Sequence, residues 1–241
     1  MEYTTFLKRA FIIFKTPWVK SIFKGQLISF SSYEILNNIK KQCKELNTII
    51  DVGANKGQFQ KSANYFYPNA KIYSFEPIPE LYNKLGKINY TRITNFNMAL
   101  GNEVGIQGFN KNEYRHSSSF YEIEIDNNNF PSSKTTKINV EINTLDNIAP
   151  KLDLIGTVLL KLDVQGFEME ALRGGKNTLK NHIDYIIIEI SFKKLYNNQP
   201  TYTELNKFLN EQNFELVTLL DFNLGKDKSY IEADFLYIKK T

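Results

Sequence analysis

The residues best suited to binding a ligand lie in the stretch IIDVGANKGQF, residues 49–59. Apolar residues lead into Asp51, and Gly53 and Gly57 follow at the spacing G-x-x-x-G. Because glycine has no side chain, the backbone at such a turn can approach a ligand closely. The turn could therefore hold a phosphate, a dinucleotide or S-adenosylmethionine, or it could serve only as a tight connection.

Two further observations narrow the choice of ligand. The spacing differs from the dinucleotide pattern G-x-G-x-x-G, because Asn55 stands in place of the second glycine, and the Gly-Lys-Ser/Thr of a phosphate-binding P-loop is missing. The next apolar run, KIYSFE at 71–76, ends in Glu76. A carboxylate at the end of the second strand can bind both hydroxyls of a ribose. The pattern favours a nucleoside ligand without phosphates.

Two more acidic residues belong to later apolar runs, Asp163 in TVLLKLDV and Glu189 in YIIIEI. If these runs are parallel strands, both carboxylates reach the sheet edge that holds Asp51. Asp163 could hold the amino group of S-adenosylmethionine, orient a substrate hydroxyl or bind a divalent cation. Glu189 lies among apolar residues, so it needs a polar partner or its pKa rises. Because no third oxygen ligand is evident, no metal site is predicted.

Chemistry on a hydroxyl group would need a general base or close positioning of the reactants. The chain has two histidines, and His116 in the polar stretch HSSSFYEIEIDNNNFPSSK is the better candidate base. The neighbouring serines could bind a polar substrate: Ser117, Ser118 and Ser119. The alternative is that His116 is an exposed loop residue.

Alternating strands and helices must position these residues. The pattern predicts strands at 48–52, 71–76, 94–100, 157–164 and 185–190, and helices at 56–66, 79–87, 167–180 and 201–212. Such alternation is typical of an α/β fold with a parallel sheet and right-handed crossovers. The final runs FELVTLL and DFLYIKK have no helix between them, so we expect them to pair antiparallel.

Residues 101–145 interrupt this alternation. GIQGFN and TKINVEIN predict two antiparallel strands with a long polar stretch between them. We expect residues 111–135 to form a mobile lid that carries substrate specificity, because this segment offers few apolar anchors.

Positive charge is concentrated near the N-terminus. Residues 1–45 hold eight of the 30 lysines and arginines but three of the 26 acidic residues. We expect them to form a basic helical appendage, with a helix at about 32–44, beside a catalytic domain of residues 46–241. The appendage would pack on the domain or on a second subunit of a homodimer, or lie on an anionic membrane surface. The rest of the chain is nearly neutral, so nucleic acid is not an expected partner.

The composition agrees with an ordinary soluble protein, at 42% hydrophobic and 23% charged residues. The single cysteine, Cys43, rules out an intramolecular disulfide and fits a reducing compartment. No uncharged apolar run approaches the 18 residues of a membrane span. We therefore predict a cytoplasmic protein, with peripheral contact at the inner face of the membrane as the variant that the basic N-terminus leaves open.

Several stretches, taken in order, resemble the FkbM-type methyltransferases that depend on S-adenosylmethionine. The resemblance covers residues 48–238 and rests on IIDVGANKGQF, YSFEPIPELYNKL, NMALGN, INTLDNI, LLKLDVQGFEMEALRGG and IIIEI. One difference is Gln165, where many relatives have glutamate, and it speaks against a role that needs a charge at this position.

The resemblance implies a Rossmann-like sheet of seven strands, parallel except for an antiparallel last strand. It implies S-adenosylmethionine as the cofactor. Asp51, Gly53, Asn55 and Gly57 would line its methionine and ribose, and Glu76 would bind the ribose hydroxyls.

The adenine would lie near the end of the third strand, beside Asn97, Met98 and Ala99. Met98 would offer it a soft apolar contact, or would simply belong to the core. Asp163 and Glu189, with His116, are the candidates for chemistry.

The resemblance implies O-methylation of a hydroxyl on a small molecule or glycan, such as a sugar of a surface polysaccharide or a natural product. Methylation of nitrogen or a carboxyl group, and a silent module that binds S-adenosylmethionine or serves as a scaffold, are the alternatives. The acidic residues at several strand ends speak against a silent module. A nicotinamide dehydrogenase is disfavoured by the antiparallel end of the sheet.

Overall fold

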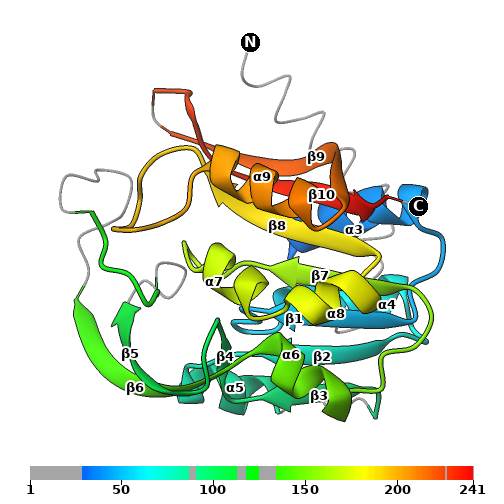
Figure 1. Cartoon of the computed structure of the whole chain (residues 1–241), viewed down its shortest axis with the longest axis horizontal. Helices are drawn as coiled ribbons and strands as arrows, with labels where there is room; N and C mark the ends of the chain where they lie inside the picture. The colour runs from blue at the N-terminus through cyan, green and yellow to red at the C-terminus, as the bar shows by residue number, and fades with distance from the viewer. Residues whose placement is uncertain (1–28, 87–90, 113–117, 125–133, 226, 241) are drawn as a thin grey trace.

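A seven-stranded sheet runs through the middle of the protein in the computed structural model (Figure 1). The structure describes residues 29–86, 91–112, 118–124, 134–225 and 227–240. The strands of this sheet are β1 (Thr48–Val52), β2 (Lys71–Phe75), β3 (Ile93–Phe96), β7 (Val158–Leu162), β8 (Tyr185–Ser191), β9 (Phe214–Leu224) and β10 (Tyr230–Lys239).

The strand order is β3-β2-β1-β7-β8-β10-β9, and β10 runs antiparallel to both of its neighbours. The first five strands of this order are parallel. This arrangement confirms the predicted parallel sheet with an antiparallel last strand. The chain leaves β1 toward β2 on one side and returns to β7 on the other, so the switch in strand order lies between β1 and β7. Ligands of open α/β sheets bind beside this switch point.

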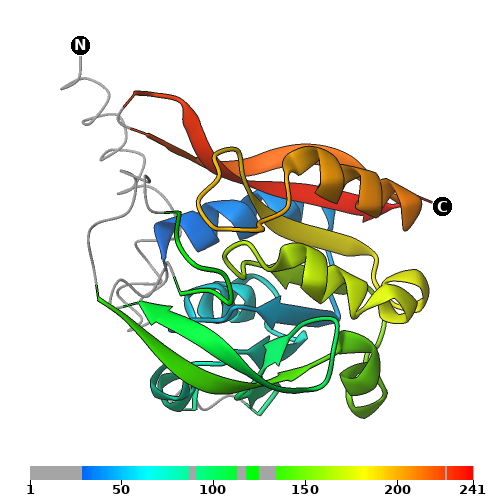
Figure 2. The same cartoon turned by 60° about the vertical axis from the view of Figure 1, so that its left-hand side comes forward.

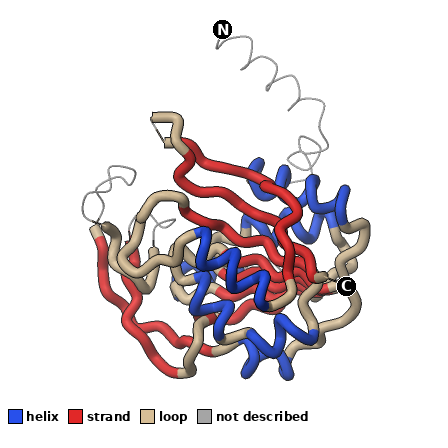
Figure 3. Tube along the Cα trace, turned by 45° about the horizontal axis from the view of Figure 1, so that its top comes forward, coloured by secondary structure: helices blue, strands red, loops and turns tan. Residues whose placement is uncertain are grey.

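Helices cover both faces of the sheet (Figure 3). Their bounds are α3 (Phe30–Gln42), α4 (Gln58–Phe66), α5 (Pro79–Leu85), α6 (Leu145–Ile148), α7 (Glu168–Arg173), α8 (Lys176–Asn181) and α9 (Tyr202–Glu211), with a 3₁₀ turn, η2, at Ala149–Lys151. The single helix expected at 167–180 is divided into α7 and α8. The division falls at Gly174, where a β-carbon would lie 1.8 Å from the backbone oxygen of Gly101.

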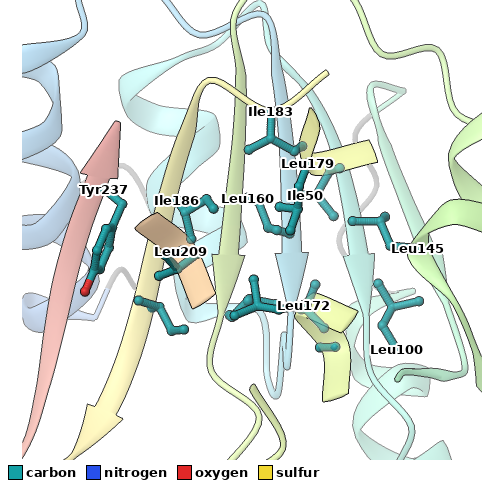
Figure 4. Close-up of a cluster of buried hydrophobic side chains, with 14 of the residues drawn as sticks. Ile50, Leu100, Leu145, Leu160, Leu172, Leu179, Ile183, Ile186, Leu209 and Tyr237 are labelled. Carbon is teal, nitrogen blue, oxygen red and sulfur yellow. The ribbon is translucent and has the colours of Figure 1, made fainter. Parts of the chain in front are cut away.

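The hydrophobic core has two main layers, one on each side of the sheet. Ile50 and Leu160 pack with α6–α9, together with Leu172, Leu179 and Leu209 (Figure 4).

On the opposite face, Ile49 and Leu159 pack with residues of α3 and α4. Successive side chains of a strand point to opposite faces. Asp51 follows Ile50 in β1, and Lys161 follows Leu160 in β7. Both side chains therefore face the side of the sheet that α3 and α4 cover.

The strand expected at 94–100 is two strands in two sheets. β3 ends at Phe96, and β4 (Ala99–Leu100) pairs parallel with β6 (Thr135–Asn143) in a second sheet of order β4-β6-β5. The side-chain amide of Asn97 donates to the backbone oxygens of Glu76 and Pro77 at 2.9 and 3.1 Å. These bonds hold the turn at which the chain leaves the main sheet.

The antiparallel pair expected within residues 101–145 is confirmed as β5 (Gly105–Asn112) and β6. Figure 2 shows the two strands as a long pair beside the main sheet. Of the expected lid, residues 113–117 and 125–133 lie outside the described residues.

The described part of that segment is better anchored than we expected. The ring of Phe120 lies 4.9 Å from that of Phe109 and 4.4 Å from that of Phe167. Ser118 and Ser119 are buried. Phe120 is thus an apolar anchor within the segment, and the mobility of the lid stays a prediction.

The N-terminal part of the described chain is helical and belongs to the packed domain. Ser29 caps α3, and Leu36 and Ile39 are fully buried against the sheet. Residues 1–28 lie outside the described residues, so the appendage and its membrane or dimer contact stay predictions. No described helix has the length and apolar character needed to cross a membrane.

Candidate active site

The turn after β1 passes through left-handed backbone at both of its glycines. Gly53, Asn55 and Gly57 have φ angles of 83°, 51° and 78°. The backbone N–H groups of Gly53 and Ala54 both donate to the carbonyl oxygen of Phe75 at 3.0 Å, which ties the turn to the end of β2. A β-carbon on Gly53 would lie 1.9 Å from the backbone oxygen of Asp163. The turn therefore needs glycine at position 53 to pass this close to the end of β7.

We expect Gly53→Ala to destabilise the protein and to abolish cofactor binding. The left-handed backbone alone costs about 1–3 kcal/mol for a residue with a side chain, and the clash with Asp163 adds to that cost. Urea unfolding measures the loss. Gly105→Ala is the matched control, because a β-carbon there meets no atom within 4 Å. Equal midpoints for the two variants would contradict the close approach at Gly53.

The carboxylate of Glu76 is held at the end of β2 by two backbone groups. One oxygen accepts from the N–H of Asn55 at 2.8 Å, and the other accepts from the N–H of Ile78 at 2.9 Å. Each carboxylate oxygen can accept a second hydrogen bond, so the group can still accept from two ribose hydroxyls. Burial raises the pKa of Glu76 to about 7, although both backbone hydrogen bonds oppose this rise.

A first cavity opens beside Glu76. Its lining includes Gly53 and Asn55 from the turn, Asp163 and Gln165 from the end of β7, and a larger group of apolar residues. The apolar part consists of Val52, Phe75, Pro77, Ile78, Leu81, Ala99, Leu100, Phe109, Phe120, Val164 and Phe167, with Ser118 among them. A polar end with an apolar wall suits a nucleoside, whose ribose is polar and whose base is flat and apolar.

Two of the three residues predicted to hold the adenine are not part of this lining. Ala99 lines the cavity, but Asn97 supports the turn after β3, and Met98 packs against the core between the sheet and α6–α9. Ile78 and Leu81 line the cavity beside Ala99, and the position of the adenine stays a prediction. The chain turns out of the main sheet at Asn97, which directs both side chains away from the cavity.

An ion-pair network lies under the turn, on the α3–α4 face of the sheet. The Lys161 ammonium lies 3.5 Å from Asp51 and 3.2 Å from Asp163. Burial alone would lower the pKa of Lys161, but the two carboxylates outweigh it and raise this pKa above its usual value. Asp51 is fully buried and absent from the lining of the first cavity, and its carboxylate lies against the Lys161 ammonium. Gly57 precedes α4 and is also absent from that lining.

A glutamine amide bridges the two acidic residues predicted for chemistry. The Nε2 group of Gln165 donates to Asp163 at 3.0 Å and to Glu189 at 2.7 Å. The hydroxyl of Tyr196 donates to Oε1 of Gln165 at 3.0 Å. The hydroxyl of Ser119 donates to the backbone oxygen of Gln165 at 2.6 Å. These contacts fix the orientation of the amide, because only its NH₂ end can donate to carboxylates.

The bridged carboxylates differ in their tendency to hold a proton. Burial would raise the pKa of Asp163, but the Lys161 ammonium and the Gln165 amide outweigh burial and hold this pKa below its usual value. Burial and the negative charge of Asp163 raise the pKa of Glu189 well above its usual value. The pair therefore combines an ionised group with a group that can exchange a proton, as acid–base catalysis requires.

Glu168 has a supporting position at the start of α7. Its buried carboxylate accepts from the backbone N–H groups of Val164 and Gly166 at 3.2 and 3.1 Å. These bonds hold the loop that carries Gln165, whose φ angle is 55°. Glu168 is the first residue of α7.

A second cavity meets the first at three shared residues: Gly53, Asn55 and Asp163. It lies between the N-terminal end of α3, the start of α4 and the ends of β7–β10. Its polar lining includes Ser29, Ser31, Ser32, Gln58, Lys161, Glu189, Asp221, Asn223 and Asp234. An elongated ligand in the first cavity can therefore reach a second ligand in the other.

Some of the predicted residues lie elsewhere or outside the structure. His116 and Ser117 are outside the described residues, so the role of His116 as a base stays a prediction. Ser118 lines the first cavity, and Ser119 supports Gln165. No group of three or more His, Cys, Asp or Glu side chains in the described part of the chain could hold a metal ion.

Sequence reasoning missed Lys161, Tyr196 and Asp234, and it gave Gln165 no role. Lys161 had a usable signal, because a lysine inside the buried strand VLLKL needs a carboxylate partner. Asp234 had a similar signal inside DFLYIKK. Tyr196 lies in a loop with no motif, and only the folded chain brings it to Gln165.

The seven-stranded sheet, the glycine turn and the acidic strand ends together define a Rossmann-like methyltransferase. The chain belongs to the FkbM methyltransferase family, since the model described as "Methyltransferase FkbM domain" matches residues 51–216. The protein is therefore an enzyme, and its cofactor is S-adenosylmethionine.

Curated relatives are methyltransferases of low identity. Methyltransferase 1 of Beauveria bassiana is 26% identical over 61% of this chain and 65% of that protein, so the chain spans slightly less than two thirds of it. Hexuronic acid methyltransferase AglP of Haloferax volcanii is 24% identical over 75% of this chain and 74% of that protein. The 2-O-methyltransferase NoeI of Sinorhizobium fredii is 24% identical over 83% of this chain and 86% of that protein.

Among solved structures, magnesium protoporphyrin IX methyltransferase (ChlM) from Synechocystis, with bound S-adenosylmethionine, has a TM-score of 0.47 and 10% identity. The match covers 87% of this chain and 78% of that chain.

The residues present fit the cofactor. Glu76 can accept from the ribose hydroxyls, and Gly53 lines the first cavity beside it. The Oδ1 atom of Asn55 is buried with no hydrogen-bond partner among the described residues. A buried acceptor of this kind is normally satisfied by a ligand or a water molecule.

Proposed function

We propose that the protein transfers the methyl group of S-adenosylmethionine to a hydroxyl of a sugar, in a glycan or a related natural product. The observation that carries this proposal is the bridged pair of Asp163 and Glu189 at the junction of the two cavities. The names of two relatives, a hexuronic acid methyltransferase and a 2-O-methyltransferase, support a sugar hydroxyl as the acceptor.

The first cavity would bind the adenosine of the cofactor. Glu76 would accept from the ribose hydroxyls, and the apolar wall with Ile78 and Leu81 would pack against the adenine. Gly53 and Asn55, which line both cavities, would hold the methionine part, and the second cavity would hold the acceptor. When bound, the cofactor supplies a methyl group on a positively charged sulfur.

Glu189 would remove the proton from the acceptor hydroxyl while the oxygen of this hydroxyl is methylated. Its raised pKa suits this role, because a carboxylate with a higher pKa is a stronger base. Asp163 stays ionised and orients the hydroxyl by accepting a hydrogen bond. Gln165 positions both carboxylates and has no contact with the reacting atoms in this scheme.

The Gln165 bridge leads to a prediction for the pH profile. Gln165→Leu removes a hydrogen bond to a charged group, worth about 1.5–3 kcal/mol, and one pKa unit corresponds to 1.36 kcal/mol. We expect the rising limb of kcat/KM against pH to move about 1–2 units toward alkaline pH. Without the bridge, the ionised form of Glu189 is less stable, so a higher pH is needed to form it.

Tyr196→Phe is the companion variant. It keeps the ring and removes the hydroxyl that orients Gln165, so a smaller shift in the same direction is expected. A pH profile identical to that of the wild type in both variants would show that the amide does not tune Glu189.

The activity is tested with S-adenosylmethionine that carries a deuterated methyl group. The protein is incubated with this cofactor and with extracted surface glycans and small hydroxylated metabolites, and the products are hydrolysed and analysed by mass spectrometry. A labelled methyl ether is the expected product. Label in an ester or on nitrogen would assign the alternative chemistries, and absence of S-adenosylmethionine binding in calorimetry would overturn the proposal.

A further inference from the structure

Three carboxylates lie side by side across three neighbouring strands at the second cavity. Glu189 on β8 pairs in register with Asp234 on β10, and Asp234 pairs with Asp221 on β9. All three side chains line the cavity. Like charges directly opposite each other destabilise a sheet. We call these three residues the acidic row.

The described lining of the second cavity holds one cation that acts on the acidic row, and its attraction for Asp234 is outweighed by burial and by repulsion from Asp163. Lys161 is the one lysine or arginine in this lining, and its ammonium is already paired with Asp51 and Asp163. Asp221 accepts from the hydroxyl of Ser31 at 2.6 Å and from the backbone N–H of Phe222 at 2.9 Å, and neither donor carries a charge. Burial and repulsion from Asp163 raise the pKa of Asp234 to about 7.

The acidic row is connected to the reacting centre. Its first member, Glu189, is bridged to Asp163 by Gln165, and Asp163 belongs to both cavities. Neighbouring strands lie about 4.8 Å apart, and hydrogen bonds are about 2.9 Å long. A hydroxyl at Glu189 and a second group at Asp234 and Asp221 can therefore belong to one small ring.

We propose that the acceptor carries a protonated amino group close to the hydroxyl that is methylated, and that Asp234 and Asp221 bind this ammonium. This inference rests on the proposed O-methyl transfer. An ammonium group has three hydrogen-bond donors and relieves the repulsion within the row. An acceptor with a carboxylate or phosphate at this place would increase the repulsion and is excluded by charge. The acceptor class is an amino sugar or an amino alcohol.

The test compares three oligosaccharides of equal length and different charge. They are the trimer of glucosamine, its fully N-acetylated neutral form, and the trimer of galacturonic acid. Binding to the full chain, saturated with S-adenosylhomocysteine, is measured by calorimetry at pH 7. We expect the glucosamine trimer to bind at least ten times more tightly than the neutral trimer, with no binding of the galacturonic acid trimer.

Two variants locate the effect. Asp234→Asn and Asp221→Asn should each lower the preference for the amino form about tenfold and leave the affinity for S-adenosylmethionine within twofold of wild type. Asp227→Asn is the matched control, because it removes an exposed carboxylate from the same β9–β10 hairpin outside the cavity.

Each remaining outcome contradicts the inference. Equal binding of the amino and neutral trimers, tighter binding of the acidic trimer, or binding of none of the three would overturn it. A loss of S-adenosylmethionine binding in Asp234→Asn or Asp221→Asn would assign the row to the cofactor instead. If the wild type does not bind S-adenosylmethionine, the proposed function fails. If it binds this cofactor and methylates a hydroxyl without a charge preference, the further inference alone fails.

Discussion

Glu189→Gln is expected to lower kcat by about 10²–10⁴-fold, the usual contribution of a general base. The substitution keeps the shape of the side chain, and the glutamine oxygen can still accept from Nε2 of Gln165. It removes the ability to take up a proton from the acceptor. Steady-state kinetics at saturating S-adenosylmethionine and acceptor measure the loss, and calorimetry should show cofactor affinity within about twofold of wild type.

The control for this variant is Glu215→Gln, which neutralises an exposed glutamate at the start of β9. It should behave as the wild type. Undiminished turnover in Glu189→Gln would remove Glu189 from the chemistry and leave Asp163 as the remaining candidate among the described residues. A loss of cofactor affinity at unchanged kcat would indicate that Glu189 binds the methionine part of S-adenosylmethionine.

Glu76→Gln is expected to weaken S-adenosylmethionine binding by about 10–100-fold, since a hydrogen bond to a charged group is worth about 1.5–3 kcal/mol. Both carboxylate oxygens accept backbone N–H groups, from Asn55 and Ile78. A glutamine amide has one accepting end, so its NH₂ group would face one of these donors. Calorimetric titration with the cofactor measures the change, and Glu76→Ala should act in the same direction.

Glu80→Gln is the matched control for Glu76→Gln, because Glu80 lies in the next helix, α5, with its side chain 56% exposed. Melting temperatures without cofactor show whether each variant is folded. If folded Glu76→Gln binds S-adenosylmethionine as tightly as Glu80→Gln, the ribose is held by other residues.

Much of the fold could be predicted, because its central strands are buried on both faces and therefore appear in the sequence as short apolar runs. TIIDV and VLLKL are examples, and both are fully buried central strands. The errors fall where contacts distant in sequence decide the local structure. Gly174 interrupts the expected helix because it packs against the backbone of Gly101. This contact joins residues distant in sequence, so the residues around Gly174 could not predict it.

The candidate site could be predicted in part for a related reason. Parallel strands bring their carboxyl ends to one edge, so the acidic residues at those ends could be grouped without knowledge of side chains. The partners of Glu189 could not be predicted in this way. Tyr196 and Ser119 reach Gln165 from two separate loops. Asp234 reaches the site through the pairing register of an antiparallel strand.

The crowding of carboxyl groups at this edge of the sheet links protons to folding. The pKa values of Glu76, Glu168, Glu232 and Asp234 rise to about 7, mainly through burial, and burial also raises the pKa of Glu189 well above its usual value. From about pH 4 to pH 7 the native state therefore holds protons that the unfolded chain releases, so these groups stabilise the fold less as the pH rises. Native protein should take up protons on refolding at pH 6. As the pH rises through this range, the enzyme gains the negative charges that its chemistry needs, and over the same pH range these groups contribute less to the stability of the fold.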